Sequence, residues 1–279
     1  MSRALVLGGG GIAGVAWEIG VLAGLADAGV DVPAADLVIG TSAGSVVAAL
    51  VTAGRSPAEL YETQLVAVPD DEQVLELDGL DLVGALATAI AGPGGEQAAR
   101  ARLGELALAA DTVPEADRRA VMADRIGTPP WPDRRLVVTA VDTADGVFTP
   151  FDASSGVDLL DAVTASCAVP GVWPPITIGG RRYMDGGIRS VTNADLAAGS
   201  ARTLVLAPLP GLGGGLGPTV DGELAILRAS GAAHLVLADA ASRAAFGPNL
   251  LDPRSRAPAA RAGRVQARAA AAAVGEFWT

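Results

Sequence analysis

Two glycine-rich turns, each set between an aliphatic strand and an apolar helix, constrain the fold more than any other feature of this sequence. A short aliphatic strand over 3–7 runs into four consecutive glycines, and residues 12–27 then carry apolar side chains at helical spacing. A second aliphatic strand over 36–39 leads into the turn Gly40–Gly44 and a helix over 45–53. Two successive strand and helix units of this kind predict an α/β fold with a mostly parallel sheet flanked by helices.

The middle of the chain has a different sequence pattern. Residues 56–133 carry helical stretches over 80–91 and 96–110, separated by Pro and Gly and without a clear strand, which predicts an inserted helical cap. Beyond it we expect strands over 135–141 and 203–206, a helix over 158–167, a hairpin over 176–184 and a long helix over 223–245. Residues 257–274 are expected to form a further helix or a frayed end. These patterns predict a single domain over 1–279, with the cap over 56–133 and a C-terminal helical region over 207–279.

Charge and cysteine content exclude several classes of partner and site. The formal net charge is −11 and all 20 positive charges are Arg, a balance that argues against a nucleic-acid partner. The same charge repels anionic lipid, so any transient membrane contact would depend on exposed apolar side chains. Cys167 is the single cysteine, which rules out an internal disulfide and favours a reducing cytoplasm. The apolar stretch 4–30 contains Glu18 and the glycine run, so we interpret it as protein core rather than a signal peptide.

Gly40-Thr41-Ser42-Ala43-Gly44 fits the pattern G-x-S-x-G on a turn from strand to helix. Such a sharp bend projects the Ser hydroxyl as a nucleophile, and the flanking glycines avoid clashes with the turn. The alternative is that Ser42 caps the following helix, a role that Ser45 could take equally well.

The first glycine turn, Gly9–Gly14, offers several backbone N–H groups at the positive end of a helix. Such a turn can hold a phosphate or an oxyanion. Interpreted as G-x-G-x-x-G, it would instead indicate dinucleotide binding, but the end of the second strand lacks the acidic residue that binds a ribose.

A serine nucleophile needs a base, and His234 is the only histidine in the chain. We expect His234 to lie within a helix, where a catalytic histidine is unusual, although the order Ser42, Asp185, His234 matches that of α/β-hydrolases. Without histidine the candidates are carboxylates. Asp185 ends a predicted strand before two glycines, and Asp142 ends another predicted strand.

Taken together, these motifs resemble the patatin-like phospholipase family. Gly9–Gly14 looks like its oxyanion motif, Gly40–Gly44 like its nucleophile elbow, and Asp185–Gly187 like its D-G-[GA] motif. Residues 165–175 are similar to its A-S-x-A-x-P and F-P-P approach to the Asp, with Trp173 in place of Phe. The likeness covers roughly 3–206 and implies a three-layer patatin-like α/β fold.

The resemblance also implies a mechanism without metal or cofactor. Ser42 would attack an ester carbonyl and Asp185 would accept its proton, with desolvation and prearranged N–H donors compensating for the weak basicity of an ordinary Asp. The implied site consists of the dyad Ser42 and Asp185, the oxyanion-hole residues Gly9, Gly10, Gly11 and Gly14, the elbow residues Gly40, Thr41, Ala43 and Gly44, and Gly186 and Gly187.

Two positions depart from the family pattern. Ala13 stands where the family usually carries Arg or Lys, so a positive charge of the oxyanion motif is missing. Asn193 matches a family Asn, but Asp195 stands where a Pro tends to follow.

The expected function is therefore lipid acyl hydrolysis, of phospholipase A or lysophospholipase type, on phospholipid or other acyl esters. A non-catalytic lipid-binding protein with the same fold is the alternative, because fold does not guarantee function. Dinucleotide binding is a third hypothesis.

Overall fold

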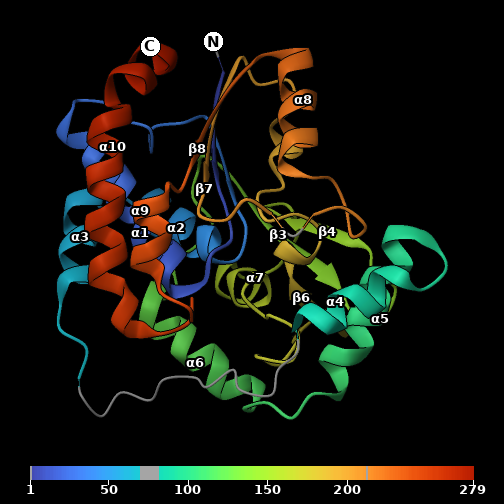
Figure 1. Cartoon of the computed structure of the whole chain (residues 1–279). Helices are drawn as coiled ribbons and strands as arrows, with labels where there is room; N and C mark the ends of the chain where they lie inside the picture. Colours follow the sequence, from blue (N-terminus) through green and yellow to red (C-terminus); the bar gives the residue numbers. More distant parts are fainter. Residues whose placement is uncertain (1, 70–81, 212) are drawn as a thin grey trace.

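The computed structural model describes residues 2–69, 82–211 and 213–279 (Figure 1). The strands are β1 (Arg3–Leu7), β2 (Leu37–Gly40), β3 (Arg135–Asp142), β4 (Phe148–Phe151), β5 (Ile176–Ile178), β6 (Arg181–Asp185), β7 (Arg202–Ala207) and β8 (Ala232–Leu237). The helices are α1 (Gly11–Asp27), α2 (Ala43–Thr52), α3 (Pro57–Leu65), α4 (Leu82–Ala91), α5 (Gly95–Ala109), α6 (Glu115–Ile126), α7 (Leu159–Ser166), α8 (Val220–Ser230), α9 (Ala240–Phe246) and α10 (Arg256–Trp278), with short 3-10 helices η1 (Gly186–Ile188), η2 (Ala194–Ala197) and η3 (Pro253–Ser255).

The strands form one mixed sheet in the order β5-β6-β3-β2-β1-β7-β8, with β4 paired to β3. The pairs among β3, β2, β1, β7 and β8 are parallel, whereas β4 and β6 run antiparallel to β3 and β5 runs antiparallel to β6. Gly40 is in register with Val138, and Asp185 with Ala140. The turn that follows β2 therefore meets the end of β6.

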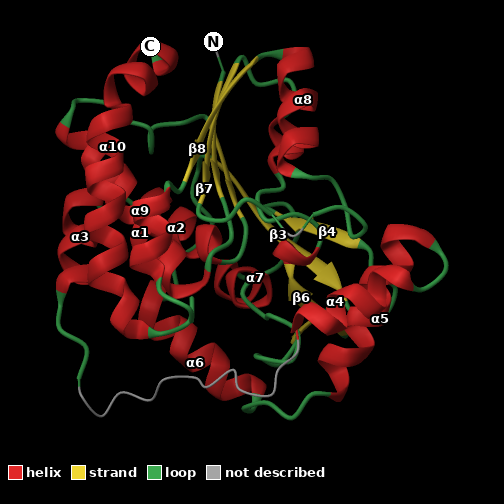
Figure 2. Cartoon of the chain, viewed as in Figure 1, coloured by secondary structure: helices red, strands yellow, loops and turns green. Residues whose placement is uncertain are grey.

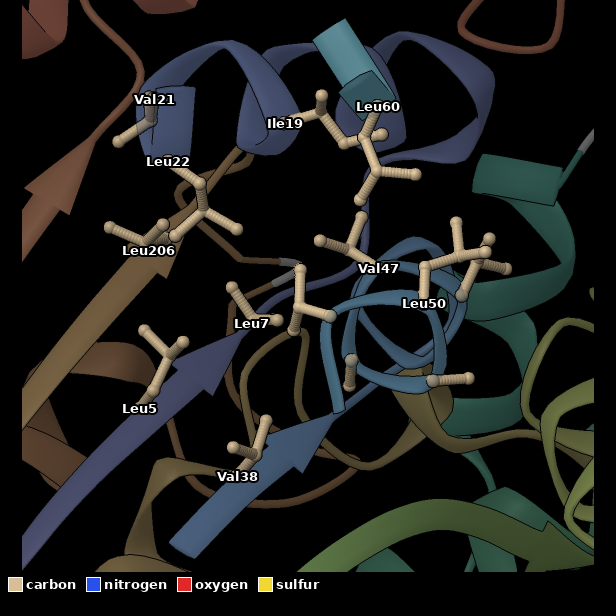
Figure 3. Close-up of a cluster of buried hydrophobic side chains, with 14 of the residues drawn as sticks. Leu5, Leu7, Ile19, Val21, Leu22, Val38, Val47, Leu50, Leu60 and Leu206 are labelled. Atoms are coloured by element: carbon tan, nitrogen blue, oxygen red, sulfur yellow. The ribbon is translucent and has the colours of Figure 1, made fainter. Parts of the chain in front are cut away.

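Helices cover both faces of this sheet and complete a three-layer α/β fold (Figure 2). Because successive strand residues face opposite sides, Leu5 and Leu7 join the larger core under α1 and α2, where Figure 3 shows them near Leu22 and Leu206. Ala4, on the other face of β1, packs in a smaller cluster with residues of η2 and α8. The mostly parallel centre of the sheet and its buried aliphatic strands agree with the expectation from sequence.

Helices α1 and α10 approach each other closely because small residues face each other along their contact. A Cβ added to Gly20 would lie 2.1 Å from the Ala260 carbonyl oxygen, and one added to Gly263 would lie 2.3 Å from the Trp17 carbonyl oxygen. Neither distance is possible for a real Cβ, so the glycines set the spacing of the two helices.

Within 56–133 the described residues are helical in four places, α3 to α6, and these helices pack against different neighbours. Helix α3 packs against α1 and α10, α4 packs against α5, and α6 packs against α7. The predicted helices over 80–91 and 96–110 correspond to α4 and α5, apart from residues 80–81, which lie outside the described residues. Helices α3 and α6 were not predicted individually.

The prediction of a long helix over 223–245 is wrong. Helix α8 ends at Ser230, residues Ala232–Leu237 form β8, and α9 begins at Ala240. The run Ala-Ala-His-Leu-Val-Leu pairs in parallel with β7, so the pairing of β8 with its neighbour overrides a helical spacing of apolar residues. The region 207–279 is therefore not purely helical.

Replacing Gly44 by alanine is expected to lower the free energy of unfolding by roughly 3 kcal/mol or more. An added Cβ would lie 2.0 Å from the backbone oxygen of Leu7, so α2 would have to move away from β1. Gly222→Ala is the control, because Gly222 is an exposed helical glycine whose added Cβ would have its nearest contact at 3.4 Å. Helix propensity predicts that this control is neutral or more stable by about 0.5–1 kcal/mol. Urea unfolding measures both, and equal effects would contradict the packing argument.

Candidate active site

Ser42 lies at the sharp turn between β2 and α2, with φ 51° and ψ −117°. A positive φ is uncommon for a residue with a Cβ and costs on the order of 1–3 kcal/mol, so the surroundings must hold it in place. The Ser42 N–H donates to the Ser166 hydroxyl at 2.9 Å. The Ser42 side chain does not cap α2, and the Ser45 hydroxyl donates to the Ser42 carbonyl at 2.6 Å. The capping interpretation therefore fails for both serines.

Asp185, at the end of β6, is 4% exposed and lies beside Ser42. Burial raises the pKa of its carboxyl to about 7, although hydrogen bonding from the Ser42 hydroxyl, the Gly187 N–H and the charge of Arg118 act in the opposite direction. The Gly187 N–H donates to Asp185 Oδ1 at 2.7 Å and fixes the carboxyl. A carboxyl with a pKa near 7 is a far better base than one near 4, because it binds a proton more tightly.

The first glycine turn lies against Ser42, because a Cβ added to Gly9 would lie 3.5 Å from the Ser42 Cβ. Its backbone N–H groups divide into two kinds: Gly9 donates to the Val191 carbonyl at 2.7 Å and Gly14 donates to the Gly10 carbonyl at 2.8 Å. Among the described residues, no acceptor is within hydrogen-bonding distance of the N–H groups of Gly10 and Gly11. The unpaired N–H groups at the positive end of α1 can donate hydrogen bonds to an oxygen that develops negative charge, while Gly9 and Gly14 shape the turn.

A buried amide joins the turns that carry Ser42 and Asp185. Asn193, fully buried, donates through Nδ2 to the Thr41 hydroxyl at 3.1 Å and to the Gly186 carbonyl at 3.2 Å. Its Oδ1 accepts from Arg189, which also forms an ion pair with Asp195 at 2.6 Å. Asp195, which stands where the family tends to have Pro, thus holds Arg189 against the side-chain amide of Asn193.

The structure separates the other two candidate bases from Ser42. His234 lies on β8, three strand spacings or about 14 Å from β2, and its ring packs on Phe277 with 5.4 Å between centroids. Partial burial lowers the pKa of His234. Asp142 forms an ion pair with Arg181, which belongs to the hairpin β5–β6. The expectation that His234 lies within a helix is wrong, whereas its distance from the site agrees with the choice of a carboxylate.

Two residues near Ser42 and Asp185 were not predicted as functional. Ser166, the acceptor for the Ser42 N–H, lies within the A-S-x-A-x-P stretch of the sequence analysis, which was the available signal. Arg118 was missed. It lies on the buried face of α6 with Met122 and Ile126, at helical spacing, so a cation within an apolar stripe was the signal.

A cavity of about 350 Å³ is lined by Gly187, the second residue after Asp185, and among others by Ile188, Val191 and Leu235. Its volume suits a small organic group. The described residues that line it come from 187–191, the 210–221 segment and β8, and none comes from 56–133. Covering of an acyl site by 56–133 stays a prediction.

The model of one protein family, described as patatin-like phospholipase, matches residues 5–198. The chain belongs to the patatin-like phospholipase family. Membership agrees with the three-layer fold. A comparison with curated proteins finds no match.

Several solved structures resemble this family member in fold. VipD from Legionella pneumophila is 14% identical, with a TM-score of 0.39, over 74% of this chain and 50% of VipD. The type III effector protein ExoU is 16% identical, with a TM-score of 0.41, over 96% of this chain and 53% of ExoU. Full-length ExoU from Pseudomonas aeruginosa, in complex with SpcU, is 17% identical, with a TM-score of 0.37, over 96% and 52% of the two chains. The patatin-like chain thus spans about half the length of the solved chains it matches.

Within the described residues, this patatin-like protein has no group of three or more His, Cys, Asp or Glu side chains placed to hold a metal ion. In the same part of the chain, none of the helices combines the length and the apolar character needed to cross a bilayer.

Proposed function

We propose that the protein is a serine-dependent lipid acyl hydrolase of phospholipase A or lysophospholipase type that uses a Ser42–Asp185 dyad. The observation that carries the proposal is the juxtaposition of the Ser42 hydroxyl with the buried Asp185 carboxyl. A serine, a base of suitable pKa and unpaired N–H donors are the three parts that acyl transfer needs.

In the proposed reaction, Ser42 Oγ attacks the ester carbonyl carbon while Asp185 accepts the hydroxyl proton. The carbonyl oxygen becomes an oxyanion held by the N–H groups of Gly10 and Gly11, each worth about 3 kcal/mol if comparable to known donors. Collapse expels the alcohol, which takes the proton from Asp185, and leaves an acyl-Ser42 ester. Water then attacks this ester, with Asp185 again as base, and releases the fatty acid.

A fluorophosphonate probe tests the nucleophile directly. It is expected to add one phosphonyl group to the folded protein, on Ser42, as measured by intact mass and peptide mapping. Ser42→Ala is expected to stay unlabelled, while Ser45→Ala keeps the label because Ser45 is a buried neighbour outside the dyad. Labelling that persists in Ser42→Ala would refute the assignment. Lack of label together with intact fatty-acid binding would favour the non-catalytic alternative.

The pH dependence of kcat/KM is expected to follow Asp185. Because the free base is the deprotonated carboxylate, activity should rise with pH through about 7 and reach a plateau above it. His234→Ala should keep the same midpoint, since His234 lies on a distant strand. Stopped assays with a short-chain ester between pH 5 and 9 measure this limb. Its disappearance in His234→Ala would assign the base to histidine instead.

A further inference from the structure

Helix α6 places a buried cation beside the dyad. Arg118 is 5% exposed, and its guanidinium carbon lies 3.9 Å from the centre of the Trp173 ring. Burial lowers its pKa to about 10, which leaves the side chain ionised at neutral pH. Arg118 and Asp185 are close enough for the charge of each to shift the pKa of the other. The cation therefore belongs to the same electrostatic environment as the proposed base.

The segment that carries Trp173 contacts both members of the dyad. At its start, Ser166 accepts the Ser42 N–H at 2.9 Å. One residue further, the Cys167 thiol lies 3.3 Å from the Ser42 carbonyl oxygen, and the Ala168 carbonyl accepts the Asp185 N–H at 2.9 Å. This segment links Arg118, stacked on its far end, to the nucleophile elbow.

Arg118 forms no ion pair among the described residues, although the charge of Asp185 lies close enough to affect it. Its Nε is buried without a hydrogen-bond acceptor, and within the described part of the chain no carboxylate lies in ion-pair distance of its guanidinium. Neighbouring Arg119 differs, because it pairs with Asp161 at 2.5 Å. Removing a charge from water is costly unless an anion compensates it. A buried guanidinium that forms no ion pair, stacked on the segment that contacts Ser42 and Asp185, thus lacks an anion that a substrate can supply.

We infer that Arg118, braced by Trp173, binds the phosphate of the substrate, so that the preferred ester is a phospholipid or lysophospholipid rather than a neutral glyceride. This inference rests on the proposed hydrolase function. Guanidinium groups bind phosphate oxygens through two parallel hydrogen bonds, and stacking on an aromatic ring fixes the plane of the fork. The phosphate of a glycerophospholipid is joined to the same glycerol as its acyl esters, so one substrate molecule can place an ester at Ser42 and its phosphate at Arg118. Arg118 therefore determines which esters are preferred.

The test compares two soluble esters with the same short acyl chain, a monoacyl glycerophosphocholine and a monoacylglycerol. Arg118→Met, which keeps an unbranched side chain over Trp173, is expected to lower kcat/KM for the phosphate ester by about 10- to 100-fold and to change the neutral ester less than about 3-fold. Arg118→Lys should recover part of the loss, because it restores charge without the fork. Arg119→Met is the matched control on the same helix and should change neither rate.

Binding to Ser42→Ala separates this inference from the hydrolase proposal. In that background, calorimetry should give weaker binding of the monoacyl glycerophosphocholine when Arg118→Met is added, whether or not the native protein turns the lipid over. Inorganic phosphate is the second probe: competition at the same concentrations would mean that any phosphate suffices, and lack of competition that the lipid headgroup is required. Equal losses for both esters, or no loss for the phosphate ester, would overturn the inference. Turnover unchanged by Ser42→Ala would instead refute the proposed function alone.

Discussion

Ser42→Ala is expected to reduce kcat/KM for ester hydrolysis by about 10⁴- to 10⁶-fold, the range found when the nucleophile of a serine hydrolase is removed. The reason is that Ala leaves the unpaired N–H groups of Gly10 and Gly11 in place but gives no atom that can form the acyl intermediate. A continuous assay with p-nitrophenyl esters of graded chain length measures the loss. The residual rate should stay above that of the uncatalysed reaction, because these N–H donors and the binding site remain.

A stability measurement guards this result against misinterpretation. Ser42 has a strained backbone, and Ala at the same φ of 51° keeps most of that strain, so the free energy of unfolding should change by no more than about 1 kcal/mol. An inactive but normally folded variant supports the nucleophile. Equal rates in the two proteins would remove Ser42 from the reaction.

Asp185→Asn is expected to lower kcat/KM by about 10³-fold or more, because general-base assistance contributes about 10² to 10⁴ and the amide cannot accept the proton. The same change is expected to raise the free energy of unfolding at pH 8 by about 1–3 kcal/mol. Burial has raised the folded-state pKa of Asp185 to about 7, so ionisation opposes folding at this pH. Kinetics and urea unfolding of one variant therefore give changes of opposite sign.

The sign of the stability effect follows from proton linkage. Between the ordinary Asp pKa of about 4 and the folded value of about 7, the folded state binds more protons than the unfolded state. The Asp185 contribution to stability is present at low pH and is lost as the pH rises through this window. The advantage of Asp185→Asn should thus be absent at pH 4 and grow up to pH 8. A pH-independent difference between the variant and the native protein would show that burial of Asp185 is not its cause.

The parts of the site that sequence could predict are those set by local backbone geometry. Gly40–Gly44 requires a tight turn at one strand end and Gly9–Gly14 requires another, and residues close in the chain specify both. The parallel pairing of β1 and β2 follows from the short strand and helix units around these turns. The sequence also predicts the hairpin that ends at Asp185, because two short strands joined by the Gly179-Gly180 turn are expected to pair antiparallel.

The features that the sequence did not predict depend on contacts between segments far apart in the chain. The apolar residues of β8 have a spacing that also fits a helix, and only the pairing of β8 with β7 shows that the segment is a strand. The prediction therefore placed His234 in a helix. The pKa of Asp185 depends on burial by segments far apart in the chain, including the 166–173 segment, rather than on its neighbours in sequence. Arg118 is 67 residues before Asp185 in the numbering, and only the packing of α6 against α7 brings their charges together.

The placement of β7 and α10 has a practical consequence for anyone who would trim this protein. The family match ends at residue 198, whereas β7 borders β1 and α10 packs against α1, the helix that begins within the first glycine turn. In a fragment that ended at residue 198, β1 would become an exposed edge strand, which favours aggregation. The face of α1 that carries Gly20 and Gly24 would be exposed to solvent. We therefore expect that the smallest fragment able to fold and to keep the candidate site includes β7 and extends into α10.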